Sequence, residues 1–171
     1  FIDEAYYEYV TAKDYADSIG LIKKYPNLMV RRTFSKMYGL AGLRIGYGLA
    51  SIEVASALQK VRQPFNANLM AQAAALAALG DDAHIRKTVK MVAEGRVWLE
   101  NELRKRKLPF VPSSANFIMM KVGDGKKVFE QLLRKGVIVR PMHGYKLPEW
   151  IRVTIGAPSQ NQKFLQALDS K

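Results

Sequence analysis

A single lysine lies within a glycine-rich segment whose residue types could support amine chemistry. The segment covers residues 33–48 and reads Thr33-Phe34-Ser35-Lys36-Met37-Tyr38-Gly39-Leu40-Ala41-Gly42-Leu43-Arg44-Ile45-Gly46-Tyr47-Gly48. Because Lys36 has aromatic and aliphatic neighbours, we expect them to strip water from its ammonium and to favour the neutral amine. A neutral amine is the nucleophile that forms a Schiff base with a carbonyl compound. The alternative interpretation is an ordinary lysine on a surface turn.

Two side chains near this lysine could bind an anion. Ser35 places a hydroxyl beside Lys36, and Arg44 offers a planar guanidinium fork further along the segment. Three glycines fall between Ala41 and Gly48, where the backbone must turn tightly or admit a close neighbour. The segment therefore combines a candidate nucleophile with candidate phosphate ligands.

An acidic stretch opens the chain. Residues 2–6 are typical of a strand that ends in two carboxylates, followed after one small residue by Tyr6. In open α/β sheets ligands gather at the carboxyl ends of strands, so Asp3 is a candidate site residue. The alternative is an exposed acidic turn. We interpret Glu4 and the neighbouring tyrosines as structural.

Two arginines occur in predicted strands near the other end of the chain. Arg140 closes the apolar run 137–139, and Arg152 lies inside the otherwise apolar run 151–155. An arginine in a buried strand is costly unless an anion or a carboxylate meets it. Both arginines are therefore candidate anion ligands, and the alternatives are a structural ion pair or a position on an edge strand.

The segment from Ser35-Lys36 through Gly39-Leu40-Ala41-Gly42-Leu43-Arg44-Ile45-Gly46-Tyr47 resembles the cofactor-lysine segment of the fold-type I pyridoxal-phosphate aminotransferases. The branch it resembles most is that of the histidinol-phosphate aminotransferases, and the stretch 64–66 also matches this branch. The resemblance implies an α/β fold: part of a large domain with a mixed, mostly parallel sheet and helices, followed by a smaller α+β C-terminal domain.

The resemblance also implies roles for the candidate residues around pyridoxal 5'-phosphate. The residue matching Lys36 holds the cofactor covalently and then moves the proton of the substrate carbon, as general base and acid. The aspartate matching Asp3 pairs with the pyridine nitrogen, and the tyrosine matching Tyr6 binds the phenolic oxygen of the ring. Ser35 and Arg44 match the phosphate ligands.

At the substrate end, the resemblance gives the two arginines a role in binding. The residue matching Arg152 grips the substrate carboxylate in most aminotransferases. In the histidinol-phosphate branch, the arginines matching Arg140 and Arg152 both face the substrate phosphate, which suits bidentate pairing with a dianion. Asn116 also matches a family pattern, but we assign it no role.

The implied activity is transamination between histidinol phosphate and 2-oxoglutarate or glutamate in histidine biosynthesis, by a cytoplasmic enzyme that is a homodimer when full length. Three alternatives stay open. The first is an aminotransferase for aromatic or other amino acids, and the second is a pyridoxal-phosphate decarboxylase acting on a phosphorylated amino acid. The third is the effector domain of a transcription regulator that uses the same fold.

Composition limits the other classes of function. With 49% hydrophobic and 25% charged residues in 171, the chain has the balance of a globular domain. It has no cysteine and only two histidines, which disfavours disulfides and a metal site. No apolar run is long enough for a membrane span, so the cytosol is the expected location. The net charge of +12 is spread along the chain, which disfavours nucleic-acid binding and suits phosphorylated ligands.

The hydrophobic pattern predicts two domains, residues 1–108 and 109–171. We expect helices over 14–24, 51–62, 66–79, 82–107 and 126–135 and from 159 onward. We expect strands over 2–6, 28–33, 44–50, 115–122, 137–140 and 150–155. The abrupt start suggests a piece of a longer protein, covering about its C-terminal half. Because the resemblance places other cofactor ligands in the missing half, we expect the chain alone to be inactive or nearly so.

Overall fold

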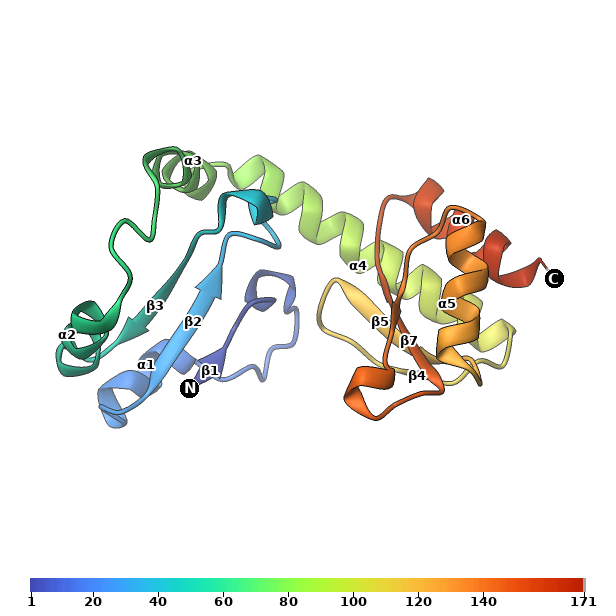
Figure 1. Cartoon of the computed structure of the whole chain (residues 1–171), viewed down its shortest axis with the longest axis horizontal. Coiled ribbons are helices and arrows are strands. Elements are labelled where there is room, and N and C mark those ends of the chain that lie inside the picture. The colour runs from blue at the N-terminus through green and yellow to red at the C-terminus, as the bar shows by residue number, and fades with distance from the viewer. Residues whose placement is uncertain (171) are drawn as a thin grey trace. The chain divides into compact units, whose positions relative to one another are not determined.

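The computed structural model describes residues 1–170 and divides into two compact units, Phe1–Thr88 and Val89–Lys171. The division falls within helix α4 (Asp82–Lys105), which begins in the first unit and continues into the second. Each unit combines a sheet with helices, so the expected α/β class is confirmed (Figure 1). The domain boundary expected after residue 108 lies beyond the other end of α4 and stays a prediction.

The first unit contains a mixed sheet in the order β1-β2-β3. Strand β1 (Ile2–Asp3) pairs in parallel with β2 (Met29–Thr33), and β2 pairs antiparallel with β3 (Gly46–Ala50), as Figure 1 shows. The helices are α1 (Ser18–Lys24), α2 (Ile52–Val61) and α3 (Leu69–Leu79), with 3-10 turns η1 (Tyr7–Tyr9) and η2 (Ala41–Leu43). The 28-residue register offset between β1 and β2 brings the acidic start of the chain beside the strand that leads to the lysine segment.

Side chains that accept a hydrogen bond from the backbone set where these helices begin. The Ser51 hydroxyl accepts from the Val54 amide at 3.3 Å, and the Asp81 carboxylate accepts from the His84 amide at 2.9 Å. The sequence predicts Ser51 as a cap and leaves Asp81 and Asp82 both open for the other helix, and the structure shows Asp81 in this role. Helix α1 begins at residue 18 and not at 14, because Asp17 is its N-cap. The expected helix over 14–24 is therefore too long by one turn.

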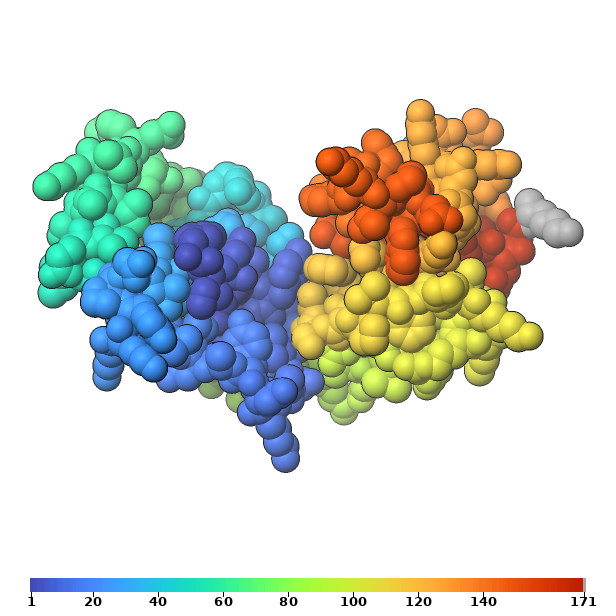
Figure 2. All heavy atoms as spheres, turned by 90° about the horizontal axis from the view of Figure 1, so that it is seen from below, coloured from blue at the N-terminus to red at the C-terminus, as the bar shows by residue number. Residues whose placement is uncertain are grey.

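The apolar faces of α2 and α3 lie largely in solvent. The pattern of α2 predicts one buried face, but Leu58 is 42% exposed and Val61 is 78% exposed, so that prediction is wrong. Helix α3 is apolar on all sides and buries only Ala71 and Ala75. Figure 2 shows the atoms of α2 and of the chain that follows it, in teal and green, at the surface of the first unit. Amphipathic periodicity predicts that a helix forms, but it does not show whether another element packs against its apolar face.

The second unit contains an antiparallel sheet in the order β4-β5-β7-β6. Its strands are β4 (Phe110–Val111), β5 (Phe117–Lys121), β6 (Arg140–Pro141) and β7 (Trp150–Thr154), and a 3-10 turn η3 (His143–Tyr145) follows β6. The strand expected over 137–140 is confined to Arg140 and Pro141. The reason is that the Val137 amide donates to the Leu132 carbonyl at 2.9 Å and so closes the preceding helix.

Helices cover one face of this sheet. Helix α5 (Gly125–Arg134) and helix α6 (Pro158–Asp169) pack with the second half of α4, as Figure 1 shows within this unit. The core residues alternate along the strands and recur on the helices, and they include Ile118, Met120, Ile151, Val153, Leu99, Leu103, Phe164 and Leu165. Helix α6 begins one residue earlier than predicted, because the Ala157 amide donates to the Gln160 side chain at 2.9 Å.

Arg106 joins the end of α4 to the end of α6. Its Nε lies 2.9 Å from Asp169 Oδ1, and its Nη2 lies 2.6 Å from Oδ2. These hydrogen bonds lower the pKa of Asp169. A carboxylate with a depressed folded-state pKa stabilises the fold above its unfolded pKa and loses that contribution as the pH falls through the folded pKa.

We therefore expect Asp169→Asn to lower the free energy of unfolding at pH 7 by about 0.2–1 kcal/mol, because the Asp169 side chain is 49% exposed and solvent screens the pair. The difference between the two proteins is expected to shrink as the pH falls from 7 toward the lowered pKa of Asp169. Both tryptophans, Trp98 and Trp150, lie in the second unit, so denaturation followed by tryptophan fluorescence over this pH range reports this difference. A deficit that persists undiminished in acid would contradict the assignment.

Candidate functional site

The backbone holds the lysine segment in a closed turn. The Phe34 amide donates to the Ile45 carbonyl at 3.2 Å, and the Leu40 amide donates to the Phe34 carbonyl at 2.9 Å. Inside this loop the Gly39 amide donates to the Lys36 carbonyl at 3.1 Å, and Gly39 has a φ of 69°, which glycine adopts without a steric cost. The glycine-rich sequence thus forms a small, hydrogen-bonded frame around the lysine.

Apolar side chains anchor this turn, but they do not shield the ammonium. Phe34 and Met37 are 4% and 1% exposed, and the Phe34 ring lies 4.9 Å from the Tyr38 ring and 5.7 Å from the Tyr47 ring. The side chain of Lys36 is exposed. The expectation that its neighbours strip water from the amine is therefore wrong. They face the core, whereas the long lysine stem leads outward from the turn.

A histidine that the sequence does not mark out also fixes this turn. His84, in the first turn of α4, places its Nε2 at 3.0 Å from the Met37 carbonyl, and its own amide is held by Asp81. From the sequence, we consider this histidine only as a possible metal ligand. Among residues 1–170 no group of three or more histidine, aspartate, glutamate or cysteine residues is placed to hold a metal ion. We assign His84 to the support of the turn.

The structure brings Tyr6 and Lys36 together. The Lys36 Nζ lies 5.4 Å from the centre of the Tyr6 ring. Tyr6 lies three residues beyond the end of β1, and Lys36 lies three residues beyond the end of β2, so the parallel pairing of these strands places the two residues at the same edge of the sheet. A tyrosine side chain and a primary amine therefore lie within reach of one small ligand.

Ser35 and Arg44 line one open pocket of about 320 Å³. Arg44 has a left-handed backbone with a φ of 55°, and its Nη1 donates to the Ala41 carbonyl at 2.7 Å. The sequence predicts these two residues as phosphate ligands, and the structure places both on one surface. It adds Arg31, which the sequence analysis missed and which lines the same pocket.

Glycines keep this pocket open. Gly46 and Gly48 stand opposite Thr33 and Arg31 in the β2–β3 register, and neither adds a side chain to the surface. A Cβ at Gly46 would lie 2.8 Å from the Arg32 carbonyl oxygen. From the sequence, we interpret these glycines as points of a tight turn or a close approach. The pairing of β2 with β3 produces the close approach.

Asp3 lies at the end of β1, where the sequence predicts it, and it is already paired. Its Oδ2 lies 2.9 Å from Arg31 Nη1, and its Oδ1 accepts from the Ala5 amide at 3.1 Å. The two charged side chains are each about half exposed. A carboxylate offers about four acceptor positions, so Asp3 retains capacity for a further donor. Arg31 links this carboxylate to the pocket of Ser35 and Arg44.

These residues together fit a phosphorylated aromatic aldehyde. A hydroxyl and two guanidinium groups surround one pocket, which suits a phosphate. The exposed Lys36 amine can reach an aldehyde, the Tyr6 hydroxyl can bind a ring oxygen, and the Asp3 carboxylate can pair with a protonated ring nitrogen. The chemistry of the donors is that required by pyridoxal 5'-phosphate.

In the second unit, Arg140 and Arg152 stand directly opposite each other in β6 and β7. Directly opposed residues of antiparallel strands point to the same face. Arg152 lies between the buried Ile151 and Val153, so the arginines share the face that the core does not use. The sequence expects a buried arginine, and the structure corrects this: Arg152 is partly exposed on the open face of the sheet.

Neither arginine has an acidic partner among the described residues. Arg140 Nη1 donates to the Tyr145 hydroxyl at 3.4 Å, and the Arg152 guanidinium lies 4.6 Å from the centre of the Phe117 ring. Both arginines line a pocket of about 360 Å³ together with Thr154. Two unpaired guanidinium groups on one face form a candidate site for a dianion.

Residues 1–168 match the family model for aminotransferase class I and II. A similar curated protein is histidinol-phosphate aminotransferase 1 of Cupriavidus pinatubonensis, which is 49% identical over 172 residues. The match covers 98% of this chain and 46% of that protein. The chain therefore spans about half the length of the curated relatives it matches.

Solved structures of histidinol-phosphate aminotransferases are also similar to this chain. The histidinol-phosphate aminotransferase from Clostridium acetobutylicum matches with a TM-score of 0.89 at 28% identity, over 98% of this chain and 52% of that one. The histidinol-phosphate aminotransferase from Sinorhizobium meliloti, solved in complex with pyridoxal-5'-phosphate, matches with a TM-score of 0.87 at 30% identity, over 97% of this chain and 46% of that one. None of the helices within residues 1–170 is long and apolar enough to cross a bilayer.

Proposed function

The chain belongs to the class I and II aminotransferase family, and we propose on that basis that it carries the cofactor lysine and the substrate-phosphate arginines of a pyridoxal-phosphate-dependent enzyme. The proposed reaction moves the amino group of histidinol phosphate to 2-oxoglutarate, with glutamate as the product. The observation that carries the substrate assignment is the opposed pair of Arg140 and Arg152, which has no acidic partner in the described chain. A phosphate dianion would relieve the repulsion between these two cations.

Each residue of the first unit has a defined task in this proposal. Bound pyridoxal phosphate supplies an electron sink for the carbon that loses its proton. Lys36 Nζ attaches the cofactor and later takes the proton from the amine-bearing carbon of the substrate. Asp3 keeps the ring nitrogen protonated, and Tyr6 donates to the ring oxygen. Ser35 and Arg44 hold the phosphate. Because Lys36 is exposed in the chain, ligand binding must provide part of the shelter from water.

The proposal extends to the setting of the enzyme. A full-length protein is proposed to be a cytoplasmic homodimer, as the family resemblance implies. The other candidate activities, on aromatic amino acids or by decarboxylation of a phosphorylated amino acid, share the residues of the first unit. An activity on aromatic amino acids differs in the ligand of the second unit, because only a phosphorylated substrate needs both arginines. The decarboxylase would also use a phosphorylated substrate and differs in the bond that it breaks.

A comparison of histidinol phosphate with histidinol tests this function. We expect the chain, supplied with pyridoxal phosphate, to bind the phosphorylated amine at least about tenfold more tightly, since each charge-assisted hydrogen bond contributes about 1.5–3 kcal/mol. Calorimetric titration measures the difference. Equal affinities, or a preference for tyrosine or phenylalanine, would contradict the proposal. Release of carbon dioxide from a phosphorylated amino acid, which unlike histidinol phosphate has a carboxyl group to lose, would indicate a decarboxylase.

In a multiple-turnover assay with histidinol phosphate and 2-oxoglutarate, the chain alone is expected to show little or no activity. Turnover close to that of the full-length Clostridium acetobutylicum enzyme would contradict this expectation.

A further inference from the structure

Glu4 is a buried acid that the proposed function does not use. Its side chain is 0% exposed, and its two oxygens have different partners. Oε2 accepts from Arg32 Nε at 2.9 Å, whereas Oε1 accepts from the Tyr15 hydroxyl at 3.1 Å and from the Ser18 hydroxyl. A buried carboxylate is costly unless it is paired and hydrogen-bonded, and here three donors from three segments meet it.

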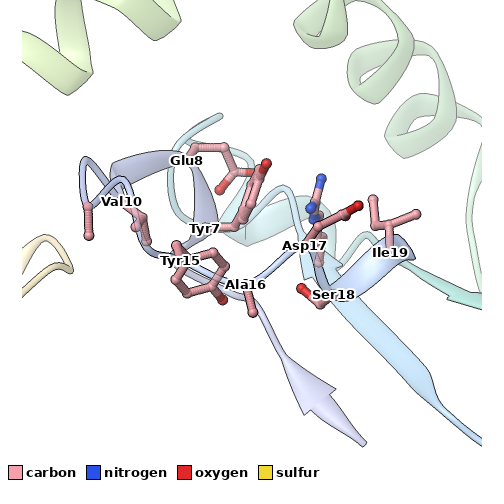
Figure 3. A pocket seen from close by; sticks show the side chains of 10 residues that line it. Tyr7, Glu8, Val10, Tyr15, Ala16, Asp17, Ser18 and Ile19 are labelled. Carbon is pink, nitrogen blue, oxygen red and sulfur yellow. The ribbon is translucent and has the colours of Figure 1, made fainter. Parts of the chain in front are cut away.

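The partner of Glu4 is equally constrained. The Arg32 side chain is 13% exposed, and its guanidinium carbon lies 3.6 Å from the centre of the Tyr7 ring. Tyr7, Tyr15, Ser18 and Arg32 line a pocket of about 410 Å³, and Figure 3 shows Tyr7, Tyr15 and Ser18 around this pocket. Burial and the hydrogen bond to Glu4 raise the pKa of Tyr15, which keeps its hydroxyl protonated as a donor.

The pair lies between the two segments that carry the proposed cofactor residues. Glu4 stands between Asp3 and Tyr6, and Arg32 precedes Lys36 by four residues. These segments touch through the short ladder of β1 and β2, which contains only two paired positions in β1. The Glu4 amide extends this ladder with a 2.8 Å bond to the Arg31 carbonyl. Because so few backbone hydrogen bonds join β1 to β2, the placement of the Asp3–Tyr6 segment relative to the lysine segment depends on buried side chains such as Glu4 and Arg32.

We propose that the Glu4–Arg32 pair is a positioning element that fixes Asp3 and Tyr6 relative to Lys36. This inference rests on the proposed function for the residues that the pair positions. Neither member of the pair contacts the proposed ligand pocket of Ser35 and Arg44 through its charged group. The pair acts through its neighbours, because it joins β2 to the residue that directly follows β1, where the parallel pairing of these two strands ends.

A competing explanation is that Glu4 only tethers the loop before α1. The two carboxylate oxygens of Glu4 accept from different donors, so variants of these donors can test the two roles separately. Ser18→Ala and Tyr15→Phe remove the donors to Oε1 and leave the bond to Arg32. Glu4→Gln and Arg32→Lys disturb the bond between the strands, since an amide does not carry the charge of a carboxylate and an ammonium lacks the guanidinium fork.

The test uses the whole chain and two measurements. The first is the nuclear Overhauser contact between the Tyr6 ring and the Lys36 side chain, whose amine lies 5.4 Å from the ring centre. The second is the dissociation constant for pyridoxal phosphate. We expect Glu4→Gln and Arg32→Lys to lose the contact and to raise the dissociation constant at least about tenfold, the effect of one lost charge-assisted hydrogen bond. Ser18→Ala and Tyr15→Phe are expected to keep both.

A matched control is Glu100→Gln, which neutralises the acid of the Glu100–Arg104 pair in the second unit and should change neither measurement. The positioning role is overturned if Glu4→Gln and Arg32→Lys keep the Tyr6–Lys36 contact, or if the Ser18 and Tyr15 variants lose it to the same degree. If the unmodified chain takes up no pyridoxal phosphate, the proposed function fails. The Overhauser contact then still decides the positioning role.

Discussion

Replacing Lys36 with alanine is expected to abolish covalent capture of pyridoxal phosphate by this chain. The cofactor carries an aldehyde, and attachment requires a primary amine next to the groups that hold the phosphate and the ring. Lys36 adjoins Ser35, which lines the pocket with Arg44, and its Nζ lies 5.4 Å from the centre of the Tyr6 ring. Treatment with borohydride makes the attachment permanent, so peptide mass mapping locates it. In any assembly that turns over, the loss of this base should also cost about 10²–10⁴-fold in rate.

Lys24 provides a matched control for this experiment. Its Nζ also lies 5.4 Å from the centre of a tyrosine ring, that of Tyr25, but unlike Lys36 it does not adjoin a residue that lines the pocket of Ser35 and Arg44. Lys24→Ala should leave capture unchanged. If borohydride fixes the cofactor equally to Lys24 and Lys36, the reaction is ordinary surface chemistry of exposed lysines and the assignment of Lys36 fails. The comparison matters because Lys36 is exposed, so its environment alone does not distinguish it.

Local features of the fold could be predicted from the sequence because they depend on short-range hydrogen bonds. Ser51 caps its helix as predicted, and Asp81 is one of the two aspartates that the sequence offers as the cap of the next long helix, since a cap needs only the two or three residues that follow. The two adjacent strands expected over 28–33 and 44–50 also occur, as β2 and β3. In contrast, the exposure of Lys36 depends on which way its turn faces. Apolar neighbours in the sequence do not reveal that direction.

Features that depend on residues far apart in the chain could not be predicted. The bond between Glu4 and Arg32 joins positions 28 residues apart, so the sequence analysis interprets Glu4 as structural without identifying its partner. Arg31 likewise enters the candidate phosphate pocket only through the pairing of β2 with β3. The sequence identifies both Arg140 and Arg152, but their direct opposition follows from a register that the pattern of apolar residues does not determine.

This opposition gives the Arg140→Gln variant an unusual expected outcome: greater stability and weaker anion binding. Like charges directly opposite on antiparallel strands destabilise a sheet by about 0.2–1 kcal/mol, and no described acid compensates Arg140. Removing one cation should therefore raise the free energy of unfolding of the second unit by that amount in the absence of anions. The same change should weaken the binding of phosphate about 10–100-fold, because one charge-assisted donor is lost. Tryptophan fluorescence during denaturation measures both, with and without phosphate, since Trp98 and Trp150 lie in this unit.

Lys121 on the same sheet separates this effect from a general loss of positive charge. Its Nζ lies 3.1 Å from Glu149, so Lys121→Gln removes a cation that already has an acidic partner. That variant should be no more stable than the unmodified chain, and phosphate should stabilise it as before. Arg140 is preferred over Arg152 for the test because Arg152 also stacks on Phe117, and its loss would combine two effects. If Arg140→Gln is less stable without phosphate and equally stabilised by it, the two guanidinium groups are not a dianion site. The substrate assignment would then lose its main support.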